Sequence, residues 1–338
     1  MGIHAISVLR VTGLALASVC LCVLPAAWTA VALWFQGPGV VIVKNLTIAL
    51  WCLFALSMLL MAWWGRPLLA LLLFALVFAG VLLWWQQIPP SNERVWADDV
   101  ARMTHGDVDG DRVTLHNVRN FDWHTPTEYE QRWETRSYDL SRLRSLDMVL
   151  SYWAGPAIAH MLMSFGFEGG EYVSYTVEIR RERNETFSEL GGFFKEFELS
   201  IIACDERDVV RVRTNVRGED AYLYRIRMSP DAMRKLFLAY VGEANGLLEQ
   251  PRWYHSVTAN CTTLVYHMMK RILGHMPFDY RVLFTGYVAA YVHEIGGLDP
   301  RYSLDELRRL GHLTEPARRA DRSAAFSTEI RAGIPPLP

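Results

Sequence analysis

The chain has 338 residues, of which 51% are hydrophobic and 21% are charged, and its formal net charge is −2. The charges are unevenly distributed: residues 1–88 contain three basic side chains and no acidic one, whereas residues 89–338 contain the other 31 basic and all 36 acidic side chains. This split excludes a uniform soluble globule and intrinsic disorder. The polar part is slightly acidic, so we expect no nucleic-acid partner, because counterion release needs clustered Lys and Arg.

Residues 1–88 are predicted to form a transmembrane segment of three helices. Stretches at about 11–35, 45–64 and 67–86 are each apolar and long enough to cross a bilayer. A cleaved signal peptide is an alternative for the first stretch, but its apolar run is too long and two further spans follow. Keeping Arg10 and Arg66 in the cytoplasm places residues 87–338 outside it.

The polar region is predicted to contain a short linker at 89–99, one domain at 100–313 and an extended or disordered tail at 314–338. Asp107–Asp111 resembles the start of a calcium loop but lacks the required glycine and closing glutamate, so we interpret it as an Asp-Gly hairpin turn. Periodicity and turn residues predict the other elements. Strands are expected at about 113–118, 159–167, 172–180, 196–203, 209–215 and 222–228, and helices at about 141–153, 230–248, 261–272 and 281–295. The fold class is therefore α+β, with a mainly antiparallel sheet and packed helices.

Cys261 is the first candidate for chemistry, because it lies where a loop becomes a helix. The free amides of a helix start stabilise a thiolate and can donate to a developing oxyanion. Three other interpretations exist for this thiol: a packed small residue, a disulfide with Cys204, or a zinc ligand with His255 and His267. The zinc set lacks the spacing of known structural sites. We expect neither a metal nor another cofactor.

A nucleophilic cysteine needs a base, usually a histidine that a third polar group orients. His160 interrupts an apolar strand, where a polar ring needs a hydrogen-bonding partner. A hydrogen-bonded core histidine is the alternative interpretation.

Three stretches of the polar region together resemble the Lnb N-terminal periplasmic domain family, a bacterial group related to NlpC/P60 enzymes, with a papain-like thiol fold in circularly permuted order. The resemblance covers roughly residues 100–300. The stretches are Asn117–Trp123 with Tyr129, Arg132–Arg136 and Tyr138–Leu140; His160 with Val177–Glu182; and Tyr254 with Asn260–Thr263 and Phe278–Tyr287. Two features differ from the family: Ala159 stands where a glycine usually precedes the histidine, and the membrane spans precede the domain.

The resemblance implies roles for individual residues. His160 matches the family histidine, as general base and then acid, and Cys261 matches the nucleophile. Glu178, on the polar face of the next strand, is the expected third member; a surface or arginine-paired carboxylate is its alternative. Tyr254 and Asn260 are candidate oxyanion or positioning groups.

The resemblance also implies a function and a location. The leading hypothesis is a membrane-anchored periplasmic Cys–His acyltransferase that forms a thioester, by analogy with lipoprotein N-acylation from phospholipid. The alternatives are a papain-like amidase or peptidase acting on cell-envelope peptides and a non-catalytic envelope module. Expected partners are membrane lipids and either lipoproteins or envelope peptides. We expect a multi-pass protein of the bacterial inner membrane with its C-terminal domain in the periplasm.

Overall fold

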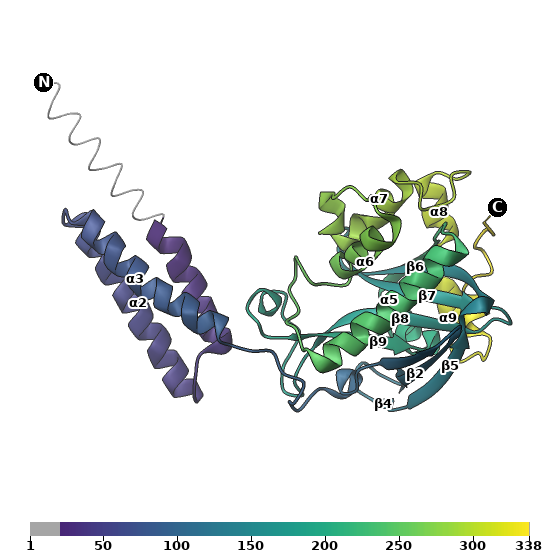
Figure 1. Ribbon diagram of the computed structural model, residues 1–338, viewed down its shortest axis with the longest axis horizontal. Coiled ribbons are helices and arrows are strands. Elements are labelled where there is room, and N and C mark those ends of the chain that lie inside the picture. Colours follow the sequence, from purple (N-terminus) through teal and green to yellow (C-terminus); the bar gives the residue numbers. More distant parts are fainter. Residues whose placement is uncertain (1–20, 338) are drawn as a thin grey trace, which may run out of the picture. The chain divides into compact units, whose positions relative to one another are not determined.

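The computed structural model describes residues 21–337, which form two units (Figure 1). The helical unit contains residues 21–90 together with the loop Ser188–Glu196. The sheet unit contains the rest, Ser91–Phe187 and residues 197–337.

The helical unit contains two helices that are long and apolar enough to cross a membrane, α2 (Val41–Trp63) and α3 (Pro67–Gln86), among the described residues. The prediction of three spans is corrected to two. Residues 11–20 of the first predicted span lie outside the described residues, and its described part, Leu21–Gln36, is an apolar helix shorter than a span. Most side chains of α2 and α3 are exposed, which distinguishes them from the core helices of a soluble domain.

The loop Ser188–Glu196 packs within the helical unit although it lies in sequence between two segments of the sheet unit. The ring of Phe194 stacks on Phe35 and lies 6.3 Å from the ring of Trp85. The ammonium group of Lys195 donates hydrogen bonds to the carbonyl oxygens of Trp85, in the last turn of α3, and of Ile88, just after the helix. These contacts close the last turn of α3, whose carbonyl groups have no partner within the helix.

The sheet unit is built on an eight-stranded sheet within the described residues. Its order is β1-β2-β9-β8-β7-β6-β10, and β5 pairs with the other side of β2. All pairs are antiparallel except β2–β9. The strands are β1 (His105–Asp109), β2 (Arg112–Arg119), β5 (Trp133–Asp139), β6 (Leu143–Ala154), β7 (Ile158–Phe167), β8 (Tyr172–Arg180), β9 (Glu198–Cys204) and β10 (Asp220–Arg225), with β3 (Asp122–Trp123) and β4 (Tyr129–Glu130) paired separately.

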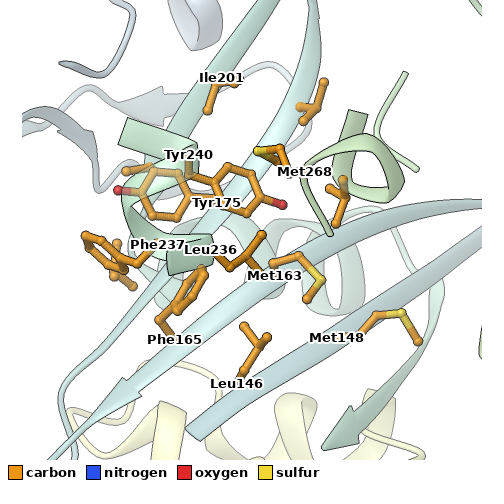
Figure 2. Close-up of a cluster of buried hydrophobic side chains, with 14 of the residues drawn as sticks. Leu146, Met148, Met163, Phe165, Tyr175, Ile201, Leu236, Phe237, Tyr240 and Met268 are labelled. Carbon is orange, nitrogen blue, oxygen red and sulfur yellow. The ribbon is translucent and has the colours of Figure 1, made fainter. Parts of the chain in front are cut away.

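Helices cover both faces of this sheet, and each face has its own core. On the first face lie α5 (Pro230–Glu249), α6 (Thr263–Leu273) and α7 (Val288–Glu294). Figure 2 shows the aromatic centre of this core, where the Tyr175 and Tyr240 rings stack 4.7 Å apart beside Phe165 and Phe237. The second face is covered by α4 (Glu206–Arg211), the π-helix η4 (Val212–Val216), α9 (Thr314–Ala320) and α10 (Phe326–Glu329), while α8 (Leu304–Leu310) contacts α7 and β10. The α+β class with a mostly antiparallel sheet is confirmed.

Two predicted elements of the sheet unit are wrong. The segment 141–153 was expected as a helix but contains strand β6, and 209–215 was expected as a strand but belongs to α4 and η4. Strand β6 is buried on both faces: Met148 packs into the first core and its neighbour Val149 into the second. A central strand buried on both faces loses the alternation that identifies strands, so its leucine spacing imitated a helix.

The predicted extended or disordered tail is also wrong, because α9 and α10 close the second core. Phe326 is fully buried there, and Arg331 is 8% exposed. The Arg331 guanidinium donates hydrogen bonds to Asp147 of β6 and Glu206 of α4, with nitrogen–oxygen distances of 2.6–2.8 Å. A sequence rich in Arg and Ala suggested solvent exposure, whereas this arginine pairs with two fully buried carboxylates.

Candidate thiol site

The site forms where the central sheet splits between β7 and β8. Their ladder ends at the pair Leu162–Thr176, although β7 continues beside β6 as far as Ile158 and β8 continues beside β9 as far as Arg180. Two residues beyond this last pair, His160 of β7 and Glu178 of β8 flank the opening. Their side chains point to the same face of the sheet as those of Leu162 and Thr176, because residues two apart in a strand share a face. Their side chains meet across the gap that the separating strands leave.

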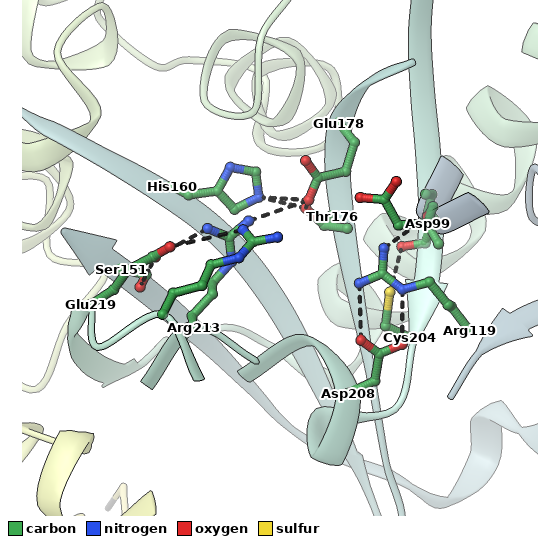
Figure 3. Close-up of polar contacts among 12 residues, drawn as sticks. Asp99, Arg119, Ser151, His160, Thr176, Glu178, Cys204, Asp208, Arg213 and Glu219 are labelled. Carbon is green, nitrogen blue, oxygen red and sulfur yellow. Dashed lines mark hydrogen bonds and ion pairs between the residues drawn. The ribbon is translucent and has the colours of Figure 1, made fainter. Parts of the chain in front are cut away.

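His160 is held by two neighbours on β8. Its Nε2 lies 2.6 Å from Thr176 Oγ1 and 3.2 Å from Glu178 Oε1, and Thr176 Oγ1 in turn donates to Glu178 Oε1 at 2.8 Å. Figure 3 shows this triangle, with the second ring nitrogen of His160 pointing away from both partners. Glu178 therefore keeps the proton on Nε2 and leaves Nδ1 available to exchange a proton with another group.

Cys261 reaches this histidine from the first face of the sheet. The thiol is 7% exposed and packs in the first core, whereas Leu162, which shares a strand face with His160, packs in the second. The side chain of His160 and the backbone of Met161 lie within reach of the sulfur, because both lower the pKa of the thiol. Two residues from opposite faces of the sheet thus meet at the opening between β7 and β8.

The turn that presents Cys261 is fixed by Asn260. Its Oδ1 accepts hydrogen bonds from the backbone N–H groups of Thr262 and Thr263 at 2.9 and 2.8 Å, and its Nδ2 donates to the carbonyl of Ser256 at 2.6 Å. This is helix capping, which satisfies amides that have no partner within α6. The Asn260 amide is therefore engaged in positioning Cys261 rather than directed at a ligand.

The electrostatics favour a charged Cys–His pair. Burial and the neighbouring Arg213 lower the pKa of His160, but the charge of Glu178 and the hydrogen bonds to Cys261 and Glu178 outweigh them and raise this pKa to about 8. Burial likewise acts to raise the pKa of Cys261, but the hydrogen bond and charge of His160 lower it below the ordinary value. The opposite shifts describe a thiolate beside an imidazolium.

Arg213 of η4 lies beneath the carboxylate end of the site. Its guanidinium is 3.4 Å from Glu178 and 3.2 Å from Glu219, and its Nε has no hydrogen-bonding partner among the described residues. Glu219 also accepts a hydrogen bond from Ser151, the residue of β6 that pairs with His160. Burial acts to raise the pKa of Glu178, but His160 and Arg213 hold it well below its usual range. Glu178 is therefore ionised, and it pairs with both the histidine and an arginine.

The structure brings Cys261, His160 and Glu178 together, and Tyr254 packs against the first core that contains Cys261. Burial is the main cause that raises the pKa of Tyr254, and the charges of Cys261 and Glu178 add to it. Cys204 and Cys261 are both free, so the alternative of a disulfide between them is wrong for this structure.

Sequence reasoning missed three residues of the site. Thr176 was assigned only to the polar face of its strand, Arg213 to a strand that does not exist, and Thr285 to a helix. The Thr285 hydroxyl lies 2.6 Å from that of Thr262, and each is about 4 Å from the Cys261 sulfur. The alternation of 172–180 already placed Thr176 beside Glu178, so this residue could have been found.

The fold and these contacts define a class: a mixed α/β domain with a buried thiol, a histidine and a carboxylate at a break in its sheet. In a comparison with protein families, residues 129–286 match the Lnb N-terminal periplasmic domain. The matched stretch is slightly less than half of the chain and includes His160, Glu178 and Cys261. No curated protein and no solved structure matches the chain. Together with α2 and α3, the family match indicates a membrane-anchored protein with a periplasmic domain.

Proposed function

We propose that this protein is a thiol acyltransferase of the bacterial inner membrane, crossing it more than once and transferring fatty acyl groups in the periplasm. The observation that carries the proposal is the Cys261–His160 pair, in which the pKa of the thiol is lowered and that of the imidazole is raised. An unpaired buried thiol would instead have a raised pKa and little nucleophilicity.

In the first half-reaction, the Cys261 thiolate attacks the carbonyl carbon of a phospholipid ester. The carbon–oxygen bond of the ester breaks, the acyl group stays on sulfur as a thioester, and the departing alkoxide takes the proton from His160. Glu178 stabilises the imidazolium before this transfer and holds the ring in place. The Tyr254 phenol is the side chain we assign to the developing oxyanion, because the Asn260 amide is engaged in the turn.

In the second half-reaction, an amine attacks the thioester. The nitrogen forms an amide with the acyl group, His160 accepts the proton that the nitrogen loses, and Cys261 leaves as a thiolate. The α-amine of a lipidated cysteine is the acceptor we propose, by analogy with the family to which residues 129–286 are similar. The two apolar helices support this choice, because they keep the domain beside a bilayer that holds lipid donor and lipidated acceptor alike.

The test uses the full chain in phospholipid vesicles that contain a donor with an alkyne-tagged acyl chain and a peptide with a diacylglyceryl cysteine at its N-terminus. We expect a hydroxylamine-sensitive label on Cys261 and a tagged amide on the peptide. Cys261→Ala removes both signals, whereas the matched variant Cys204→Ala retains them.

Equal amide formation by the wild type and by Cys261→Ala would refute the proposal. A labelled thioester that yields only free fatty acid, with no amide, would show a hydrolase using the same pair.

A further inference from the structure

An apolar cavity lies between the first face of the sheet and helices α5, α6 and α7, and the residues that follow His160 and Cys261 in sequence contribute to its lining. Its volume is about 260 Å³. The lining side chains share an apolar character, and Arg227 is the one charged residue among those described. Six methionines contribute to the lining: Met148, Met161, Met163, Met228, Met269 and Met276. Figure 2 shows Met148 and Met163 side by side on β6 and β7.

The cavity is connected to the reacting groups through two lining residues that adjoin them in sequence. Met161 follows His160, and Thr262 follows Cys261. The Thr262 hydroxyl oxygen is 3.9 Å from the Cys261 sulfur. An acyl group attached to this sulfur therefore has the methionine-lined space within reach of its chain.

The cavity also reaches the protein surface. Two of its lining residues, Leu273 at the end of α6 and Ile295 after α7, are 49% and 38% exposed. A chain can therefore enter from outside while its carbonyl end stays at Cys261. Large side chains at this rim remain apolar, which suits a ligand that arrives from lipid rather than from water.

We propose that this cavity binds the fatty acyl chain that Cys261 transfers, and so selects long-chain over short-chain donors; this inference rests on the proposed acyltransferase function. Methionine side chains are flexible and polarisable, and they adapt to a chain that adopts many conformations. Each methylene moved from water into such surroundings contributes to donor affinity in proportion to its buried area. The walls provide no row of hydrogen-bonding groups for a peptide backbone.

The experiment fills the cavity and compares two donors. Met269 of α6 is half-buried and lines the cavity, whereas its neighbour Lys270 is exposed and does not. The full-length variants Met269→Trp and Lys270→Trp are compared with the wild type, in detergent, for thioester formation on Cys261 from a palmitoyl and from an acetyl thioester donor.

We expect Met269→Trp to slow labelling by the palmitoyl donor at least about tenfold, since excluding two methylenes from apolar surroundings forfeits that much affinity. Labelling by the acetyl donor should stay within about twofold, and Lys270→Trp should change neither rate. Val292→Trp, on the α7 wall, gives a second filled cavity if the first variant does not fold.

The outcomes separate the two proposals. If the filled variants slow the labelling of Cys261 by both donors equally, or by neither donor, the acyl-chain cavity is overturned and the acyltransferase proposal stands. A wild type that is labelled by the acetyl donor alone overturns both the acyl-chain cavity and the transfer of fatty acyl groups, and leaves only a reactive Cys261. A wild type in which neither donor labels Cys261 refutes the acyltransferase itself, and the cavity inference with it.

Discussion

Cys204 and Cys261 are both buried, and both have an arginine and a carboxylate nearby, yet their chemistry differs. Beside Cys204, Arg119 forms a two-point ion pair with Asp208 at 2.8 and 3.1 Å (Figure 3). Asp208 also accepts a hydrogen bond from the indole of Trp123. The charge of Arg119 is thus neutralised by Asp208. Burial raises the pKa of the Cys204 thiol far above its usual range, and the nearby guanidinium does not compensate.

The surroundings of Cys261 differ because a titratable group lies close to the sulfur. His160 lowers the pKa of the thiol, and the carboxylate of Glu178 raises the pKa of the imidazole. This cluster is also less enclosed, since the side chains of His160 and Glu178 are 14% and 19% exposed, against 5% and 0% for Arg119 and Asp208. In this chain, a guanidinium that is already paired with a carboxylate leaves the pKa of a buried cysteine raised, whereas a neighbouring histidine lowers it.

The largest expected effect comes from His160→Ala. Without the imidazole, burial dominates at Cys261 as it does at Cys204, so we expect the alkylation rate of Cys261 at pH 7 to fall by about 10²–10⁴-fold. Mass spectrometry after timed iodoacetamide treatment measures both cysteines in one sample. Cys204 is the internal control and should be labelled slowly before and after the change. Rapid labelling of Cys204 in the wild type would contradict the expected difference in reactivity between the two cysteines.

The second prediction concerns stability around Cys204. Asp208→Asn leaves the buried Arg119 charge without its partner and should cost about 3 kcal/mol or more. Glu315→Gln removes an exposed ion pair with Arg318 and should cost less than about 1 kcal/mol. Amide hydrogen exchange of β2 and β9 in the solubilised full chain measures both. Equal protection in the two variants would mean that the Arg119–Asp208 pair contributes no more than a surface pair.

The same contrast explains which parts of the fold and site could be predicted from sequence. Strand β8 was predicted correctly because it alternates between an apolar and a polar face, and Glu178 was found on the polar face. Cys261 was found because a helix start is visible in sequence. The role of Arg213 could not be predicted, since its segment forms a π-helix that packs against the sheet. The opening between β7 and β8 depends on where two ladders end, and no local pattern encodes that.

A smaller effect is expected for Glu178→Gln, and it appears in the pH dependence. The Glu178 charge raises the pKa of His160 to about 8, against burial and Arg213, which both lower it. His160 must be protonated to give a proton to the departing alkoxide. Thioester formation should therefore decline as pH rises through the pKa of His160. Removing the charge lowers the pKa of His160. We therefore expect the alkaline limit, the pH above which thioester formation declines, to fall by about one unit or more.

The pH profile of thioester formation measures this shift. Glu182→Gln, which removes a carboxylate paired with Arg94, should leave the alkaline limit near pH 8. If Glu178→Gln also leaves it there, Glu178 does not stabilise the imidazolium, and the assignment of the third member fails.

The smallest effect is expected for Thr176→Val, which removes the hydroxyl that bridges His160 and Glu178 at 2.6 and 2.8 Å. The direct His160–Glu178 contact of 3.2 Å remains, so the charge that raises the histidine pKa is kept while one orienting hydrogen bond is lost. We expect thioester formation to slow by about tenfold or less, with little change in the alkaline limit.

Thr114→Val is the matched control, because it removes a strand hydrogen bond with Ser137 away from the site. A shift of the alkaline limit as large as that of Glu178→Gln would show that the hydroxyl, rather than the carboxylate, transmits the stabilisation of His160. The carboxylate would then act only through Thr176, and the contrast with Cys204 would rest on a hydrogen-bonded relay rather than on a direct charge pair.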